Sequence, residues 1–549
     1  MLFDGLHSVV FLQSFTVFPE YFVAISGIYV LIILVFISYN NYEIMVERAV
    51  SECVGLILLM SCYLILNDEI IKLDLLSFNN SIVNDYLGIF TKFIICFFSS
   101  IYFFLIADSL KEQKLTAFEY LVLILFAVLG LMLLCSSNDL LTAYLAIELT
   151  SLSSYILASF KKNSSYSVEA GITYFVTGAV SSAFFLLGSS ILYALSGSIY
   201  IIDFWDLFTD SYETTLSLVS QTISFQSNLM NNTAWNQFND FISLISILEF
   251  YNFNLLEIGL TFILLSLFIK LALAPFHLWS LDVYEGSPTS STFFFAVITK
   301  LSIFIFLIRL CYIALLAFAN CWQFYSLWIA LFSIFVGSFG GLKQRKLKTL
   351  LAYSSTSHMG YSLLAFSSGH IFGIQILLFY LIIYMISGLC TWFIILLVRL
   401  KKPKVTAKYT KELGDLVLLN KSNVALAFSL ALTMFSIAGI PPLIGFFAKM
   451  GIFLTLLKSK MYVIPLIALL CSVISTFYYI RVIKILYFEN ALVGKLCYPL
   501  KTNKTIILAI LIFLLIFLFV NPTFLFLIIF DVINESFHFA DNFFKVSSN

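Results

Sequence analysis

The segment FIKLALAPFHLW, residues 268–279, decides how this chain is expected to fold. It is apolar enough to lie inside a membrane, yet it contains Lys270 and, five residues later, Pro275. A proline removes a backbone donor and clashes with the preceding helical turn. Unwound backbone at membrane depth is tolerated only where it is buried in protein or lines water. We therefore expect a broken helix whose lysine faces a hydrated cavity.

The chain as a whole has the composition of a helical membrane protein. Of its 549 residues, 61% are hydrophobic and 11% are charged, and its mean hydropathy is +1.01. Soluble domains contain about 45–50% apolar and about 25% charged residues. Apolar stretches of about 20 residues, each able to cross a hydrocarbon core of about 30 Å as a helix, recur along the length. The composition therefore predicts an all-α polytopic membrane protein.

We expect about fourteen membrane-spanning helices, and the distribution of basic residues supports that number. The loops after odd-numbered spans hold 21 Lys and Arg residues, whereas the opposite side, including Arg309, holds 5. Under the positive-inside rule this asymmetry places both termini on the outer side. The expected limits are 18–38, 50–66, 87–107, 119–137, 139–160, 167–196, 256–275, 289–311, 321–341, 349–368, 371–398, 423–457, 462–487 and 504–532.

Four charged residues stand out because they fall deep inside spans. A charge within the bilayer is expensive and is functional by default. Glu148 lies near the middle of span 139–160, Lys300 near the middle of span 289–311, and Lys449 follows a second break at Pro441 and Pro442. The fourth is Lys270. A static ion pair that pins helices together is the alternative for Glu148, and we favour a functional role. Lys92, close to the outer end of its span, is explained by snorkelling.

Other polar side chains are candidates for a proton relay. His358 ends a run of five polar residues, 354–358, and can titrate near neutral pH, although helix packing is a fair alternative for this run. His277 lies at the inner mouth of the first broken span, where proton uptake and a plain interfacial role are equally open. For Lys346 and Lys348, at the inner mouth of span 349–368, a positive-inside role is favoured over chemistry.

The two broken spans that carry a lysine are the seventh and the twelfth. Paired broken helices in matching halves are typical of inverted repeats, and an odd offset of five spans reverses the second unit in the membrane. We therefore expect two inverted five-helix repeats. The expected divisions are three N-terminal helices in 1–117, a first repeat in 118–312 with an acidic outer loop at about 197–255, a second repeat in 313–488, and a C-terminal helix with its tail in 489–549.

The sequence contains no motif for a cofactor. Its nine cysteines are scattered singly and read as small apolar residues in a packed bundle. No glycine-rich nucleotide fingerprint follows a strand, and no P-loop is present. We therefore expect no metal and no cofactor in this chain, and no nucleic-acid partner.

Four stretches carry a resemblance to a known family. From about residue 85 to 490 the chain closely resembles the chain 2 family of NADH–ubiquinone oxidoreductase, respiratory complex I, which is related to subunits of multi-subunit cation/proton antiporters. Several motifs agree with this family in order and spacing. They are YLAIELTSLSSYILASFKKNSSYSVEAGITYFVTGAVSSAFFLLG (144–188), FIKLALAPFHLWSLDVYEGSPT (268–289), KLKTLLAYSSTSHMGY (346–361) and TMFSIAGIPPLIGFFAKMGIF (433–453).

The resemblance implies a fold of fourteen helices with two inverted repeats and a role in proton translocation. The family's central glutamate would be Glu148, and its lysines would be Lys270, Lys300 and Lys449. In the related chain 4 a glutamate typically stands where this chain has Lys449. Chain 5 adds a long lateral helix, for which we expect no room after residue 532. The acidic loop 197–255 departs from the usual length.

The resemblance also implies a setting. The partners would be other membrane-arm subunits of complex I, including the antiporter-like chains 4 and 5, together with the lipid bilayer. NADH, FMN, iron–sulfur clusters and ubiquinone are expected in partner subunits. The 60 phenylalanines, with abundant Ile and Asn, suggest an AT-rich coding genome. We therefore expect the mitochondrial inner membrane, with the bacterial plasma membrane as the alternative.

In the expected mechanism, Glu148 and Lys270 form a switchable ion pair. While the two are paired, the carboxylate favours the charged lysine, and when they separate, desolvation favours the neutral lysine and the proton leaves. Lys300 and His358 would pass the proton towards Lys449. Two other functions stay open, which are a self-standing Na⁺/H⁺ antiporter subunit and a passive scaffold whose charges only hold helices together.

Overall fold

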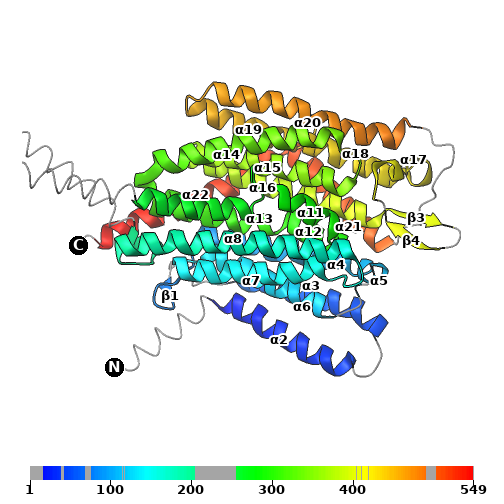
Figure 1. Ribbon diagram of the computed structural model, residues 1–549, viewed down its shortest axis with the longest axis horizontal. Helices are drawn as coiled ribbons and strands as arrows, with labels where there is room; N and C mark the ends of the chain where they lie inside the picture. Colours follow the sequence, from blue (N-terminus) through cyan, green and yellow to red (C-terminus); the bar gives the residue numbers. More distant parts are fainter. Residues whose placement is uncertain are drawn as a thin grey trace, which may run out of the picture.

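The computed structural model describes residues 17–38, 43–67, 76–113, 115, 118–204, 255–402, 405–409, 411–417, 419–489 and 502–547. Within this part the chain forms an elongated helical bundle with a short β-hairpin at each end (Figure 1). Most of the acidic loop expected at 197–255 lies outside the described residues. The described chain begins and ends at the same end of the bundle, opposite the β3–β4 hairpin (Figure 1).

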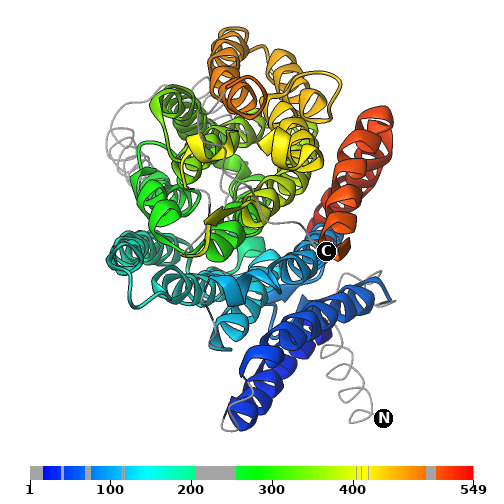
Figure 2. The ribbon, with the colours of Figure 1, turned by 90° about the vertical axis from the view of Figure 1, so that its right-hand side faces the viewer.

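The N-terminal helices form a partly separate layer. α2 and α3 lie to one side of the bundle (Figure 2), where α2 packs directly on α6 and α3 packs on α4. Asp85 begins α4, and its side chain accepts a hydrogen bond from the Gly88 backbone N–H at 2.9 Å. The elements are α2 (Phe18–Ser38), α3 (Glu43–Leu66), β1 (Leu76–Ser77), β2 (Ile82–Val83), α4 (Tyr86–Ile106) and α5 (Ser109–Glu112).

The first group of five spans covers residues 119–314. Its last helix ends as a π-helix, η2, a rare form that is frequent at functional sites. The elements are α6 (Glu119–Ser136), α7 (Leu140–Ser159), α8 (Ser165–Ser196), a helix over 255–270, α11 (Leu278–Gly286), α12 (Thr289–Val297), α13 (Thr299–Ile308) and η2 (Arg309–Ala314).

The second group of five spans covers residues 316–487. α16 lies in its middle, where it contacts α12, α15, α18, α19 and the two C-terminal helices α21 (Thr502–Val520) and α22 (Pro522–Ser547). The elements are η3 (Leu316–Phe318), α14 (Ala319–Gly340), η4 (Gly341–Lys343), α15 (Leu347–Ser367), α16 (Ile371–Leu397), β3 (Arg399–Lys402), β4 (Val405–Tyr409), η5 (Leu413–Leu416), α17 (Leu419–Ser422), α18 (Val424–Ala438), α19 (Gly445–Lys458) and α20 (Val463–Tyr487).

Both helix breaks occur where the prolines predict them. The first helix stops at residue 270, and α11 begins at Leu278, with Pro275 between them. The second break separates Ala438 from Gly445 and contains Pro441 and Pro442. The peptide bonds before Pro275 and Pro442 are cis. Each break leaves backbone groups without helical partners at the level of the neighbouring helices.

All fourteen expected spans are helical in the structure. Ten described helices are long and apolar enough to cross a membrane, and the bent pair formed by α21 and α22 brings this to eleven. The other three expected spans are not among these long apolar helices, for reasons that the structure shows. The helix over 255–270 and the α18–α19 pair are shortened by the breaks, and α15 contains the polar run 354–358.

The expectation of a single C-terminal helix over 504–532 was wrong. α21 (Thr502–Val520) ends at Asn521, and α22 (Pro522–Ser547) leaves it at an angle of 83°. Pro522 suits the first position of a helix because its missing N–H has no helical partner there. α22 continues past residue 532 to Ser547 and packs against α4 and α16.

Candidate functional site

Glu148 lies on one face of α7 with two hydroxyl groups. Ser151 and Tyr155 follow it by three and seven residues, a spacing that places all three side chains on the same helix face. The Ser151 hydroxyl donates to Glu148 Oε2 at 3.3 Å. Glu148 Oε1 is buried and has no hydrogen-bond partner among the described residues. The carboxylate therefore retains an unused acceptor inside the protein.

Lys270 ends the helix over 255–270 and faces Tyr155. Its Nζ donates to the Tyr155 hydroxyl at 3.3 Å and lies 5.8 Å from the centre of that ring. Within the described residues no ion pair joins Lys270 to Glu148, so the structure shows the two expected partners separated. Tyr155 is on the same α7 face as Glu148, and within the described residues no hydrogen bond joins these two side chains. Lys270 is thus held by the phenol and not by the carboxylate.

A tryptophan packs against the first break. Trp279 Nε1 donates to the carbonyl oxygen of Ile269 at 3.0 Å, next to Lys270. The Trp279 ring stacks on Tyr174, with centroids 4.8 Å apart and an interplanar angle of 7°. Ala272 has a φ of +58°, a left-handed conformation that is uncommon for a residue with a side chain. Packing of aromatic rings thus holds an irregular backbone beside the lysine.

Lys300 contacts a second tyrosine, from the central helix α16. Its Nζ donates to the Tyr384 hydroxyl at 3.4 Å and lies 5.3 Å from the ring centre. The Tyr384 hydroxyl in turn donates to the carbonyl oxygen of Ala296 at 3.1 Å. Lys300 is 5% exposed, so this phenol replaces part of the water that the ammonium has lost. Tyr384 therefore couples α13 to α16.

His358 lies between Tyr384 and the second broken helix. Its Nδ1 is 2.6 Å from the Tyr380 hydroxyl, and its Nε2 is 3.2 Å from the Tyr479 hydroxyl. The His358 ring is also 5.4 Å from the Tyr384 ring, measured between centroids. Both ring nitrogens have partners that can donate or accept, so either neutral tautomer is accommodated. His358 thus has hydroxyl groups on both sides.

Lys449 lies near the beginning of α19, and its amine reaches the end of α18. Its Nζ donates to the carbonyl oxygen of Ala438, the last residue of α18, at 2.7 Å. It also lies 5.5 Å from the centre of the Tyr361 ring. The last carbonyls of a helix have no helical partner and carry a partial negative charge, which favours a cation. The break therefore supplies a fixed site for the charged form of Lys449.

A small cavity separates Lys449 from His358. It measures about 20 Å³, enough for about one water molecule. The hydroxyl of Ser436, which also lines it, is buried and has no partner among the described residues. A water there would have polar groups to bind. The lining residues are His358, Tyr380, Ile383, Tyr384, Ser387, Ser436, Ile437, Gly445, Ala448 and Lys449.

The three candidates for proton uptake lie at the basic end of the bundle. His277 is 9% exposed, its Nδ1 has no partner among the described residues, and its ring is 6.2 Å from that of Tyr353. Lys346 forms an exposed ion pair with Glu285. Lys348 Nζ donates to the carbonyl oxygen of Ser287 at 2.7 Å. Both lysines thus fasten the start of α15 to the end of α11.

Sequence reasoning did not identify the tyrosines that contact these groups. Tyr155 is seven residues after Glu148, and Tyr380 and Tyr384 are four residues apart on one face of span 371–398. That spacing was a usable signal, because a buried phenol needs a hydrogen-bond partner. Tyr479 carried no comparable signal. Which hydroxyl meets which titratable group depends on the packing of distant helices.

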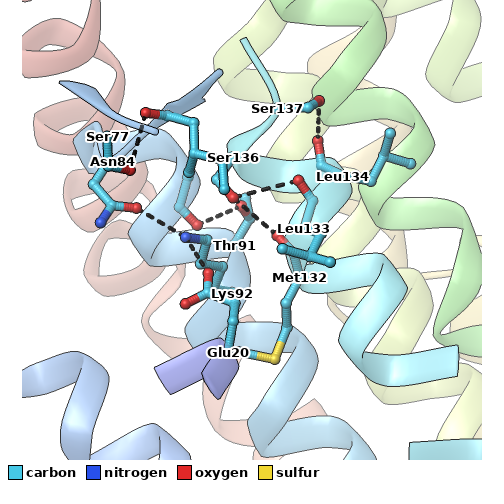
Figure 3. A network of polar contacts seen from close by, with 12 residues as sticks. Glu20, Ser77, Asn84, Thr91, Lys92, Met132, Leu133, Leu134, Ser136 and Ser137 are labelled. Carbon is cyan, nitrogen blue, oxygen red and sulfur yellow. Dashed lines mark hydrogen bonds and ion pairs between the residues drawn. The ribbon is translucent and has the colours of Figure 1, made fainter. Parts of the chain in front are cut away.

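A second group of charges lies at the outer end, and two expectations about it were wrong. Lys92 does not snorkel, because it is 2% exposed, forms an ion pair with Glu20 at 2.5 Å and donates to Asn84 Oδ1 at 2.9 Å (Figure 3). Arg309 is not in a loop, because it begins η2, is 4% exposed and forms an ion pair with Asp85. Both charges are neutralised inside the bundle. We call these five residues the outer cluster.

Comparisons with known proteins identify the family of the chain. Residues 137–227 and 214–475 match the family described as NADH:quinone oxidoreductase/Mrp antiporter, TM. NADH-quinone oxidoreductase subunit N of Paramagnetospirillum magneticum is 32% identical over 494 residues, covering 90% of this chain and 92% of the relative. NADH-ubiquinone oxidoreductase chain 2 of Marchantia polymorpha is 37% identical over 417 residues, covering 76% of each.

Solved structures share the fold. A chain of respiratory complex I from Thermus thermophilus superposes with a TM-score of 0.70 at 23% identity, covering 92% of this chain and 98% of that one. A chain of the Mrp complex from Dietzia sp. DQ12-45-1b also has a TM-score of 0.70, at 15% identity, with 94% and 97% covered.

Proposed function

We propose that this chain moves protons through its interior. The premise is its family, since the chain belongs to the antiporter-like membrane proteins that include NADH-quinone oxidoreductase subunit N and NADH-ubiquinone oxidoreductase chain 2. It would move protons as a membrane-arm subunit of respiratory complex I. Partner subunits would oxidise NADH and reduce quinone. The chain's own task would be to bind, hold and release protons.

The observation that carries the proposal is the row of titratable groups that leads from the end of the first group of five spans into the second. Lys300 contacts Tyr384, the Tyr384 ring contacts His358, and His358 shares a cavity with Lys449. Lys300, His358 and Lys449 are between 5% and 6% exposed. Buried titratable groups are expensive, and a scaffold does not need three of them in a row with hydroxyls between.

The first broken helix would supply protons to this row. Lys270 is held by Tyr155, and Glu148, on the same face of α7, has a buried oxygen to spare. When the carboxylate approaches, the charged lysine is favoured. When it withdraws, the phenol alone stabilises the ammonium less well, and the proton can leave. Within the described residues no hydrogen bond joins Lys270 to Lys300, so transfer between them would need water.

The chain would perform this work without a redox centre of its own. NADH, FMN, iron–sulfur clusters and ubiquinone would be bound by partner subunits, which would include the antiporter-like chains 4 and 5. Proton movement against the membrane potential requires about 2.3 kcal/mol per charge per 100 mV, which electron transfer in those partners would supply. The composition favours the mitochondrial inner membrane over the bacterial plasma membrane.

A second candidate function is cation/proton antiport, favoured by the family match, which includes Mrp antiporters. In that function the same groups would exchange protons for Na⁺. A passive scaffold is the third alternative. It would require only that the charges hold helices together.

The test is proton pumping by assembled complexes that carry Lys300→Met. This change keeps the apolar stem and removes the titratable group. We expect assembly near wild type, with the rate of proton pumping reduced about tenfold, equivalent to about 1.4 kcal/mol in the barrier. Tyr312→Phe, a buried phenol away from the row, is the matched control. Full pumping by the Lys300 variant would refute the proposal, and Na⁺-dependent proton exchange without redox partners would favour the antiporter.

A further inference from the structure

An open groove of about 780 Å³ lies at the basic end of the bundle, between α6 and α7. α6 begins there and α7 returns there, so the α7–α8 turn lies beside the start of α6. The groove is lined by Gln113, Glu119, Leu123, Ile156, Ser159, Phe160, Lys161, Lys162, Asn163 and Ser164. None of these residues belongs to the proton path described above.

Gln113 contributes a buried amide to the lining of the groove. It is 4% exposed, and its Oε1 accepts hydrogen bonds from the Ser290 backbone N–H at 3.4 Å and from the Ser290 hydroxyl at 3.1 Å. The backbone donor fixes which end of the amide is the oxygen. Its Nε2 is buried with no partner among the described residues. A buried donor left without an acceptor destabilises the protein, so an acceptor is expected to meet it.

The mouth of the groove favours an anion. Lys161 and Lys162 lie on the turn between α7 and α8 and bring two positive charges. Ser164 is the N-cap of α8, a helix of 32 residues, and its side chain makes no capping hydrogen bond. The start of a helix carries a partial positive charge and free N–H groups. Among the described residues of the lining, Glu119 is the one that is acidic.

The walls become apolar towards the middle of the membrane. Leu123 lies one turn into α6, and Ile156, which is 50% exposed, lies about one turn before the end of α7. The exposed leucines Leu145 and Leu152 continue this apolar surface along α7. A polar mouth at the inner membrane surface that leads into an apolar wall matches the shape of a phospholipid better than that of a free ion or an acidic peptide.

We propose that this groove binds one anionic phospholipid by its phosphate headgroup. Gln113 Nε2 and the two lysines hold the phosphate oxygens, and an acyl chain lies against Leu123 and Ile156. Basic pockets on the inner side of membrane proteins bind anionic headgroups in this way. The site is separate from the proposed proton path and does not depend on it.

The experiment uses the intact membrane assembly that contains this chain, reconstituted in phosphatidylcholine nanodiscs with a photoactivatable phosphatidylglycerol. Labelled peptides are mapped by mass spectrometry, and wild-type labelling is expected within 113–123 and 156–164. Each lysine near an anionic headgroup contributes roughly fivefold to affinity. Lys161→Gln with Lys162→Gln should therefore lower labelling about 25-fold. Lys343→Gln, an exposed lysine at the same end of the bundle but outside the groove, should leave it unchanged.

Two further variants test the sign of the effect. Glu119→Gln removes the acidic group and should raise labelling about fivefold, whereas Gln113→Glu keeps the size, replaces the donor and should lower it. Equal labelling in all variants would overturn the proposal. Loss of labelling on addition of inorganic phosphate would instead identify a free-phosphate site. A cross-link from the groove to an acidic segment of a neighbouring subunit, without lipid label, would also overturn it.

Discussion

The two broken helices hold their lysines by different means. In the first, Lys270 comes before the break and donates to a side chain, the Tyr155 phenol, while Glu148 waits on the same face of α7. In the second, Lys449 comes after the break and donates to a backbone carbonyl, that of Ala438. A side-chain partner can rotate away, but a carbonyl at a helix end cannot. The comparison indicates a switched lysine in the first half and an anchored one in the second.

The largest effect is expected at Lys449. Lys449→Met removes the titratable group and should reduce pumping in assembled complexes roughly tenfold or more. Lys449→Arg keeps the charge, but arginine effectively never deprotonates, so pumping should also fail. The measurement is complex yield together with protons moved per NADH oxidised. If Arg restores full pumping while Met disrupts assembly, Lys449 is only an anchor, and the proton path ends elsewhere.

The next effect is expected at Glu148. This carboxylate is proposed to switch Lys270 in the first half, whereas in the second half a backbone carbonyl holds Lys449. Glu148→Gln keeps the side-chain size and removes the charge that favours protonated Lys270. We expect pumping to fall severalfold, on the order of 1 kcal/mol, with assembly intact. The matched control is Glu52→Gln, on α3, whose carboxylate is exposed and paired with Arg48. Wild-type pumping per electron in the Glu148 variant would show that no switch operates there.

A smaller effect should follow removal of the phenol that holds Lys270. Tyr155→Phe deletes one hydrogen bond from a charged donor, worth about 1.5–3 kcal/mol locally. Since Glu148 can partly replace it, pumping should fall only about threefold. Tyr174→Phe, which removes a hydroxyl from the same aromatic group without a hydrogen bond to Lys270, should have less effect. Combining Tyr155→Phe with Glu148→Gln should cost more than the sum of the two single changes, and simple additivity would argue against a shared lysine.

The smallest effect is expected at the mouth of the second half. Lys346→Gln breaks an exposed ion pair with Glu285, and such pairs contribute about 0–1 kcal/mol. Pumping should stay within about twofold of wild type at ordinary ionic strength. A pumping loss comparable to that of Lys449→Met would assign Lys346 to proton uptake.

The sequence predicts the course of the backbone well and the meeting of side chains poorly. Hydrophobic length, basic loops and the prolines at 275 and 441–442 are local signals, and they predicted the spans and both breaks. The contact between Lys92 and Glu20 joins residues on different helices, and no local pattern gives the rotation of one helix about its axis towards another. The same holds for Tyr479 beside His358.

The bend at the C-terminus was missed for a different reason. Asn521 followed by Pro522 has the form of a helix start, with a capping residue and then a proline at the first helical position. The apolar residues on both sides continue without a pause, and hydropathy alone joined them into one span. Here local chemistry was the better guide and the average over a window was the poorer one.

The outer cluster sets a rule for shortening this chain. Deleting α2, α3 and α4 as a block would remove Glu20 and Lys92 together, so neither residue of that ion pair would be left without its partner. The same deletion would take Asp85 but keep Arg309, whose buried guanidinium would lose its counter-ion at a cost of about 3–5 kcal/mol. A truncated homologue must therefore replace this arginine or borrow an acid from a neighbour. An arginine at position 309 is therefore expected where the three N-terminal helices, or another source of an acidic partner, are present.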